Sequence, residues 1–504
     1  MPGSGPAATL SVTGTQVVRT SPRLGSYDAV ALFSIVAFAT YVVLAIAGGG
    51  GRALSVSYPV GCFVVALIAY ARSPRTYLAF TWWLWLLTPM LRRIFDLRYG
   101  FHPASSLLLG PLLATALAIF TIARRRKMLR SSAYVPFLIA TIGLAYGFLV
   151  GIIRQSPVAA AYDLINWVAP LFFGLHLALE WRQFPQLART MLTCILFGLV
   201  VTSLYGIVQF ASPPLWDRTW VVNADMQSVG TPVPFIIRVF STLNAPGPFS
   251  IMLIFSLLLG VAAPQRWRAV PLALGLVALV LTKGRSAWGA FALGAIVLQF
   301  RQPIRSLPRQ WLAVAVVILL AAPVITQPKV MAVLTGRAAS LTNVSGDQSY
   351  QARLKTTRDA LADIASNPVG DGLGKLGGAA KLLTGGNSSA ALDSGPLEVF
   401  TLMGWIGGTL YMMALIAIIL PVARRSRVAY EQVTAAATAA VVALLATSLF
   451  GNIFTNVSGF FFWTAIGVAT AGRTYVAAAT LATRFAAMDA APPGQTSERR
   501  ASVA

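Results

Sequence analysis

Charge is scarce in this chain of 504 residues. Only 11% of the residues are charged, whereas soluble domains carry about 25%. Hydrophobic residues make up 57% and the mean hydropathy is +0.72, with apolar runs recurring from Asp28 to the C-terminal region. This pattern excludes a water-soluble fold and a single membrane anchor. It predicts a multipass integral membrane protein.

Cysteine and histidine are almost absent as well. The two cysteines, Cys62 and Cys194, lie inside apolar runs, which argues against a disulfide framework and a thiolate metal site. The two histidines, His102 and His176, add little metal chemistry, so we expect no metal site and no cofactor. A net charge of +24 would suggest nucleic acid in a soluble protein, but in a membrane protein the position of each cation matters more. We therefore expect no nucleic-acid partner.

The apolar segments predict an all-α polytopic membrane protein with about 14 transmembrane helices, in a range of about 12 to 14. They cover residues 29–47, 54–71, 76–91, 104–123, 133–153, 164–179, 191–211, 247–263, 269–283, 286–300, 311–327, 396–420, 432–451 and 459–480. Alternate loops carry basic clusters, which predicts that these loops and both termini are cytoplasmic. The clusters are Arg72/Arg75, Arg124 to Lys127 with Arg130, Arg266/Arg268, Arg301/Arg305/Arg309 and Arg424/Arg425/Arg427.

These segments divide the chain into five regions. We expect a disordered cytoplasmic tail at 1–27, transmembrane helices 1 to 11 at 28–325 with an outer loop at 212–246, a long periplasmic loop at 326–395, helices 12 to 14 at 396–480, and a second disordered cytoplasmic tail at 481–504.

The stretch around Arg285 allows two interpretations. A single helix from Val270 to Phe300 would bury Lys283 and Arg285 in the middle of the bilayer and would reverse the side of every later segment. Two half-buried helices that meet at a polar break avoid both consequences, and we favour this alternative.

The long outer loop contains one predicted helix. Between Tyr350 and Ser366, apolar residues recur on one helical face, and Asn367-Pro368 ends the pattern. The Gly- and Ser-rich stretch Gly370 to Ser389 follows, with a length typical of functional lids. Its Gly372-Leu-Gly374-Lys-Leu-Gly377 matches a dinucleotide fingerprint in letters only, because it follows a helix and a proline where that motif needs a strand. We interpret it as a flexible turn.

Arginines gather near the predicted outer face. Arg92, Arg93 and Arg98 follow a Trp-rich segment, and their role is either interfacial anchoring or substrate binding. Arg353 and Arg358 of the outer-loop helix are further candidates for substrate binding.

Arg238, Lys283 and Arg285 lie at the ends of apolar helices. A cation inside a membrane region is costly and indicates function. The alternative is structural pairing with an acid or with helix carbonyls. Guanidinium groups suit phosphate because they give paired charge-assisted hydrogen bonds at any biological pH.

Carboxylates on the same face provide candidates for a general base toward a sugar hydroxyl. They are Asp347, Asp371, Asp393 and Glu398. Asp393 and Glu398 rank highest because they flank the start of the predicted helix at 396–420.

Three patterns from about Ala133 to Gly451 give the chain a family resemblance. They are Arg238-Val-Phe-Ser-Thr-Leu-Asn-Ala-Pro-Gly-Pro; Thr282-Lys-Gly-Arg285-Ser-Ala-Trp288; and Asn367-Pro-Val-Gly-Asp-Gly-Leu-Gly374, with Arg358 before it and Asp393-Ser-Gly-Pro-Leu-Glu398 and Met403-Gly-Trp-Ile-Gly-Gly408 after it. In order and spacing the chain resembles the O-antigen ligase and polysaccharide polymerase superfamily of bacterial inner membranes.

This resemblance implies a membrane-embedded glycosyltransferase of class C type. Family members transfer a glycan from a polyprenyl diphosphate, without metal and with inversion, at the outer face of the inner membrane. The active site would then face the periplasm in a lipid environment. By the resemblance, Arg238 and Arg285 would hold the diphosphate, and Asp393 or Glu398 would be the base.

The acceptor distinguishes the alternatives. Ligases, which transfer glycan to lipid A core, usually carry a histidine where this chain has Asp393-Ser-Gly, and the long loop has no histidine. We therefore favour a polymerase of repeat units for O-antigen, capsule or exopolysaccharide, with an O-antigen ligase second and a transporter or flippase third. The sequence leaves open whether the protein works alone or beside a flippase and a chain-length regulator.

Overall fold

Helices follow one another along the whole described chain. The computed structural model describes residues 28–301, 348–384, 392, 394–423 and 432–489, and this part contains no strand. Its α-helices are α1 (Ala29–Ala47), α2 (Gly51–Arg72), α3 (Pro74–Tyr99), α4 (Leu109–Ala116), α5 (Ala118–Arg124), α6 (Val135–Arg154), α7 (Pro157–Leu179), α8 (Phe184–Ala211), α9 (Leu215–Asn223), α10 (Pro246–Gly260), α11 (Ala269–Leu281), α12 (Arg285–Arg301), α15 (Gln348–Ser366), α16 (Gly377–Thr384), α17 (Gly395–Ala423), α18 (Gln432–Thr447) and α19 (Asn456–Asp489).

Eight of the described helical segments are long and apolar enough to cross a membrane. This confirms the predicted all-α polytopic membrane fold. The full count of about 14 stays a prediction, because the segment expected at 311–327 lies outside the described residues. The two-helix alternative around Arg285 is confirmed, since α11 ends at Leu281 and α12 begins at Arg285.

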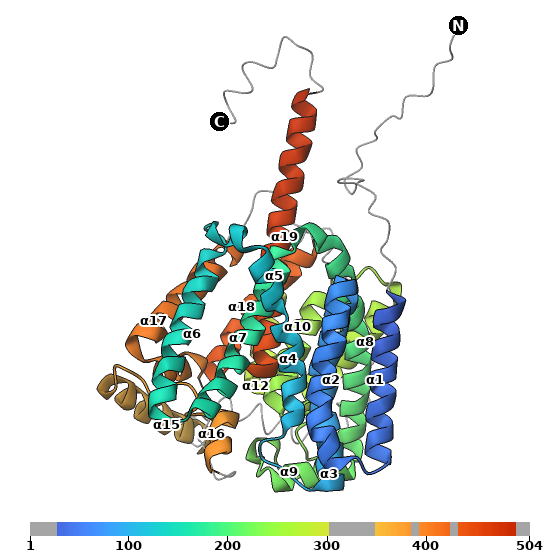
Figure 1. The fold of residues 1–504 in the computed structure, drawn as a ribbon, viewed down its shortest axis with the longest axis vertical. Helices are drawn as coiled ribbons and strands as arrows, with labels where there is room; N and C mark the ends of the chain where they lie inside the picture. Colours follow the sequence, from blue (N-terminus) through green and yellow to red (C-terminus); the bar gives the residue numbers. More distant parts are fainter. Residues whose placement is uncertain (1–27, 302–347, 385–391, 393, 424–431, 490–504) are drawn as a thin grey trace.

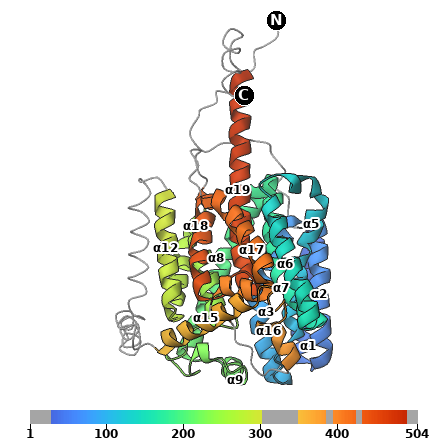
Figure 2. The same cartoon turned by 90° about the vertical axis from the view of Figure 1, so that its left-hand side faces the viewer.

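The ends of the bundle differ in what they carry. The start of α1 and the end of α19 lie at one end, while α9, α15 and α16 lie at the other (Figures 1 and 2). We call the latter the α9/α15 end. The predicted outer-loop helix is confirmed as α15, and α19 continues to Asp489, past the boundary expected at 480.

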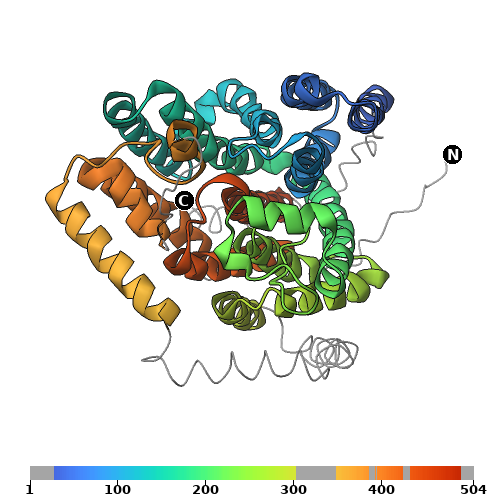
Figure 3. The same cartoon turned by 90° about the horizontal axis from the view of Figure 1, so that it is seen from below.

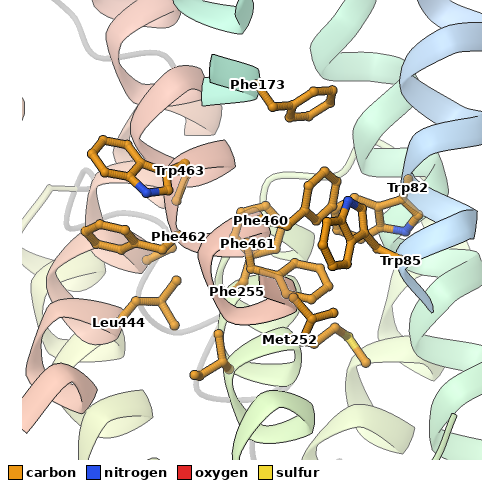
Figure 4. Close-up of a cluster of buried hydrophobic side chains, with 14 of the residues drawn as sticks. Trp82, Trp85, Phe173, Met252, Phe255, Leu444, Phe460, Phe461, Phe462 and Trp463 are labelled. Atoms are coloured by element: carbon orange, nitrogen blue, oxygen red, sulfur yellow. The ribbon is translucent and has the colours of Figure 1, made fainter. Parts of the chain in front are cut away.

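Small residues and aromatic rings hold the helices together. Gly174 of α7 and Gly467 of α19 lie so close that a Cβ atom on either would approach the other helix's backbone carbonyl oxygens at 2.4 Å, a contact typical of tightly packed membrane helices. Beside this crossing, Trp82 of α3 packs against Phe255 of α10 and Phe461 of α19 (Figure 4). These contacts fix the central helices and therefore the ends that carry the polar residues.

Candidate functional site

Two long connections form the α9/α15 end. One joins α8 to α10 and includes α9, and the other leads to α17 and includes α15 and α16. Figure 3 views the bundle from this end and shows α15 along its outer edge. The described candidate residues all lie in these connections or at the adjoining helix ends.

The motif at Arg238 folds against the break between α11 and α12. The guanidinium of Arg238 donates from Nε to the carbonyl oxygen of Thr282 at 3.1 Å and from Nη1 to that of Ser228 at 2.8 Å. The backbone N–H of Val239 donates to the carbonyl oxygen of Leu281 at 3.2 Å. The first two sequence patterns are therefore one structural unit.

Lys283 occupies the break itself. Its φ of 54° lies in the left-handed region that residues with a side chain rarely adopt. Its Nζ donates to the carbonyl oxygen of Ile236 at 2.8 Å and lies 5.2 Å from the centre of the Phe210 ring. Structural pairing with backbone carbonyls was the alternative to a functional role, and Lys283 makes such a contact. It therefore joins the connection before Arg238 to the break between α11 and α12.

Arg285 is the first residue of α12 and is half-buried. The first turn of a helix leaves backbone N–H groups unpaired and carries partial positive charge, which favours anions. Trp288, one turn later, donates its indole N–H to the carbonyl oxygen of Leu279 at 3.0 Å and ties α12 to α11. We call Arg238, Lys283 and Arg285 the basic cluster.

Arg93 takes a structural position behind this cluster. Its side chain is 0% exposed and forms an ion pair with Asp217 of α9 at 2.9 Å. It also donates to the carbonyl oxygen of Ser241 at 2.6 Å and lies over the ring of Phe240 at 4.8 Å. In this structure Arg93 therefore holds the connection that follows Arg238 and does not face an open surface.

Gln209 of α8 extends the same network. It donates to the Asp217 carboxylate at 2.6 Å, and its own carbonyl oxygen accepts the backbone N–H groups of Phe240 and Ser241 at 3.0 and 2.8 Å. Burial raises the pKa of Asp217, while the charge of Arg93 and the hydrogen bond from Gln209 act in the opposite direction. Sequence reasoning missed both Asp217 and Gln209.

Arg92 and Arg98 lie on other faces of the α3 end. Arg92 is buried, pairs with Asp96 at 3.2 Å, and stacks over Trp220 at 4.5 Å. Arg98 is exposed and donates to the carbonyl oxygen of Ala47 at 2.9 Å.

The glycine-rich stretch after α15 inserts into a break in α17. Gly404 has φ 60° and ψ −165°, so α17 is interrupted there. The carbonyl oxygens of Thr401 and Leu402 accept the backbone N–H groups of Asp371 and Gly372 at 2.8 and 2.9 Å. The inserted stretch thus supplies hydrogen bonds that the interrupted helix lacks.

Three glycines allow this insertion, and the expectation of a flexible turn is wrong. Gly370, Gly372 and Gly374 have φ of 83°, 84° and 99°. A Cβ atom on Gly370 would lie 2.3 Å from the backbone nitrogen of Gly404, and one on Gly372 would lie 2.3 Å from that of Gly151. Glycine serves here for close backbone approach in a packed segment.

Glu398 lies in the first turn of α17 and is half-buried. The side chains of Asn452 and Asp163 contribute to the electrostatic environment of its carboxyl group. Asn452 accepts the backbone N–H of Phe454 at 2.7 Å, which fixes its amide. Asp163 of α7 accepts the backbone N–H of Gly374 at 2.9 Å. We call Glu398, Asp163 and Asn452 the acid cluster.

Asp163 is a third residue that sequence reasoning missed. The signal was present, because Asp163 begins the polar pair Asp163/Asn166 inside an apolar helix, and an ionisable residue at such a place indicates function. From hydropathy alone, the segment was predicted to begin at residue 164, just after Asp163, whereas α7 begins at Pro157.

Four other candidates are not brought into these clusters by any described contact. Arg358 is exposed on α15. The side chain of Arg353 and all of Asp393 lie outside the described residues. Asp371 accepts a hydrogen bond from the side chain of Asn367 at 2.9 Å, so it serves the inserted stretch.

The fold and the site together define an integral membrane protein with cations and carboxylates at one end of an all-α bundle. No curated protein matches the chain. Residues 270–412, however, match the O-antigen ligase family, which supports the predicted resemblance to the O-antigen ligase and polymerase superfamily. The matched segment contains Lys283, Arg285 and Glu398, and the family implies a glycosyltransferase-like ligase or polymerase activity on a polyprenyl-linked glycan.

Proposed function

We propose that the protein polymerises polyprenyl-diphosphate-linked oligosaccharide repeat units into surface polysaccharide, such as O-antigen, capsule or exopolysaccharide. The observation that carries this proposal is the hydrogen bond between Arg238 and the backbone of Thr282, next to Arg285. It gathers the basic cluster in a chain whose later part matches the O-antigen ligase family.

The diphosphate of the donor would bind at the basic cluster. Arg238 and Arg285 would provide guanidinium groups and the first turn of α12 its unpaired N–H groups, which together stabilise the negative charge of a departing diphosphate. Lys283 would act mainly through the backbone carbonyl contacts that hold the cluster together.

Glu398 would act as general base. A hydroxyl oxygen of the acceptor sugar attacks the anomeric carbon, and the bond from that carbon to the diphosphate oxygen breaks with its electron pair left on the diphosphate. The hydroxyl proton passes to the Glu398 carboxylate. Attack from the side opposite the diphosphate inverts the anomeric configuration, and the charge balance requires no metal. Asp393 stays the alternative base.

The cellular setting belongs to the same proposal. The α9/α15 end would face the periplasm of a bacterial inner membrane and both termini the cytoplasm, because the basic clusters Arg124 to Lys127 and Arg266/Arg268 lie at the opposite end. A flippase would then deliver the substrate and a chain-length regulator would limit the product.

An O-antigen ligase is the second candidate, favoured by the description of the matched family. It would use the same basic cluster and differ in its acceptor, lipid A core. The chain has no histidine between its expected spans at 311–327 and 396–420, which supports the polymerase.

The test uses purified protein in liposomes with a polyprenyl-diphosphate oligosaccharide as the only substrate and a metal chelator throughout. We expect a ladder of repeat-unit multiples when products are resolved by size. Arg285→Ala should abolish the ladder, whereas Arg266→Ala should leave it unchanged, because exposed Arg266 lies at the other end of α11. Glu398→Gln should slow polymerisation about 10²- to 10⁴-fold, the usual contribution of a general base, with substrate still bound.

Each other outcome contradicts a defined part of the proposal. Polymer of normal length from Arg285→Ala would remove Arg285 from the mechanism. Product that forms only with added lipid A core would establish the ligase. No product with either acceptor would contradict glycan transfer and favour the transporter.

A further inference from the structure

An apolar groove lies between α1 and α3, away from both clusters. It encloses about 550 Å³, and apolar side chains dominate its lining, including Phe38 of α1 and Phe80 and Trp83 of α3. Tyr58 of α2 forms its floor and directs its hydroxyl group to Thr88 at 2.6 Å. The groove therefore offers an apolar surface with no charged side chain in its lining.

Helix α1 forms one side of the groove. It packs mainly on α2, where the ring of Phe38 sits so closely on Gly61 that a Cβ atom there would lie 2.2 Å from it. Only Ala31 and Val42 of α1 are buried, and α1 stands at the edge of the bundle (Figures 1 and 3). A groove at this position opens to the bilayer, so its occupant in a membrane is a lipid chain.

The length of the groove distinguishes between lipid chains. Its lining on α3 runs from Thr76 to Ile94, which at about 1.5 Å per residue corresponds to about 27 Å. The hydrocarbon core of a bilayer is about 30 Å thick, so an acyl chain from one leaflet covers only about half of the groove. A long isoprenoid chain can cover all of it.

The two ends of the groove differ in charge. At the α9/α15 end, Arg98 follows Ile94 by one helical turn and bridges to the end of α1 through the carbonyl oxygen of Ala47. Arg52, in the first turn of α2, is also exposed there. At the opposite end, Arg72 is paired with Asp28 at 4.0 Å, and Arg75 precedes Thr76, the first lining residue on α3. Arg98 and Arg52 give the α9/α15 end two exposed guanidinium groups with which a phosphate group can pair.

We propose that the groove between α1 and α3 binds the isoprenoid chain of a polyprenyl-diphosphate-linked substrate, with its diphosphate beside Arg98 and Arg52. This inference rests on the proposed function and adds a lipid site apart from the basic cluster. A polymerase needs two such substrates at once, and one groove can hold only one of the two chains.

The test is photo-crosslinking of the full-length protein in nanodiscs with a photoactivatable long-chain polyprenyl diphosphate that carries no sugar. We expect crosslinked peptides from α1 and α3. Ala39→Trp and Ala79→Trp should each reduce crosslinking about tenfold, because the indole displaces chain contacts worth about two methylene groups. Ala37→Trp is the matched control, since Ala37 is exposed on α1 outside the groove.

Competition separates the lipid sources. Unlabelled polyprenyl diphosphate should suppress crosslinking, polyprenol should do so less well, and phosphatidylglycerol should have little effect. Equal competition by phosphatidylglycerol, crosslinks mapped elsewhere, or equal crosslinking in the filled and control variants would overturn the inference. Because capture requires no turnover, a failure of glycan transfer would leave crosslinking intact and would count against the proposed function alone.

Discussion

Removing the charge of Asp217 tests the network that holds the connection after Arg238. Asp217→Asn keeps the shape of the side chain and an oxygen that accepts from Gln209, but it leaves the guanidinium of Arg93 buried without a counter-charge. Both side chains are 0% exposed. Breaking such a pair from one side costs about 3–5 kcal/mol of the free energy of unfolding.

The control lies a few residues away in the same connection. Asp225 is exposed and has φ of 46°, and asparagine tolerates this left-handed conformation as well as aspartate does. Asp225→Asn should therefore change the free energy of unfolding by less than about 0.5 kcal/mol. The measurement is equilibrium unfolding of both variants in detergent micelles at pH 8.

A double variant separates the ion pair from the remaining contacts. Arg93→Gln with Asp217→Asn replaces both charges by amides, and we expect it to be more stable than Asp217→Asn alone, because no buried charge is left unpaired. The reasoning would be refuted if Asp217→Asn cost less than about 1 kcal/mol relative to Asp225→Asn. Additive effects of the two single changes would refute the ion pair in particular.

Two further changes test the packing of the glycine stretch and an ion pair at the opposite end of the bundle. Gly372→Ala should destabilise the protein by about 2 kcal/mol or more in the same assay, while Gly377→Ala, also at positive φ but with open space around it, should cost only about 1 kcal/mol. Burial raises the pKa of Glu180, but the hydrogen bond and charge of Arg125 and the charge of Arg124 outweigh burial, so its pKa lies below the ordinary 4.5. The resulting stabilisation is complete above pH 4.5 and is lost as the pH falls through the lower pKa of the folded state. Glu180→Gln should therefore be less stable than the wild type at pH 7, and the difference should vanish in acid. Equilibrium unfolding at several pH values measures this difference.

Hydropathy predicted the helices well where side chains are uniformly apolar. Helix α6 was expected at 133–153 and is Val135–Arg154. The start of α7 was placed too late because Tyr162 and Asp163 lower the local hydropathy. The capping signal was nevertheless present, since Ser156 accepts the backbone N–H of Ala159 at 3.1 Å and Pro157 follows it.

The contacts within the site could be predicted only in part. The family resemblance implied that Arg238 and Arg285 hold one ligand, the diphosphate. Nothing local marks Arg93 as the partner of Asp217, because a contact between residues so far apart in sequence leaves no trace in periodicity or composition. The packing of the glycine stretch was not predicted for a similar reason. Glycine permits both flexibility and close packing, and only the neighbouring backbone decides between them.

The break in α17 explains why such packing occurs beside the acid cluster. Interrupting a helix at membrane depth exposes carbonyl groups that lipid cannot satisfy, so irregular backbone is tolerated there only when protein covers it. The stretch around Gly372 covers the break. Two residues later in the same stretch, the backbone N–H of Gly374 donates to the Asp163 carboxylate. One inserted segment thus covers the break in α17 and binds the Asp163 carboxylate of α7. If Glu398 is the base, as proposed, this rigid backbone keeps its carboxyl group in position when a flexible glycan binds, as attack on a single anomeric carbon requires.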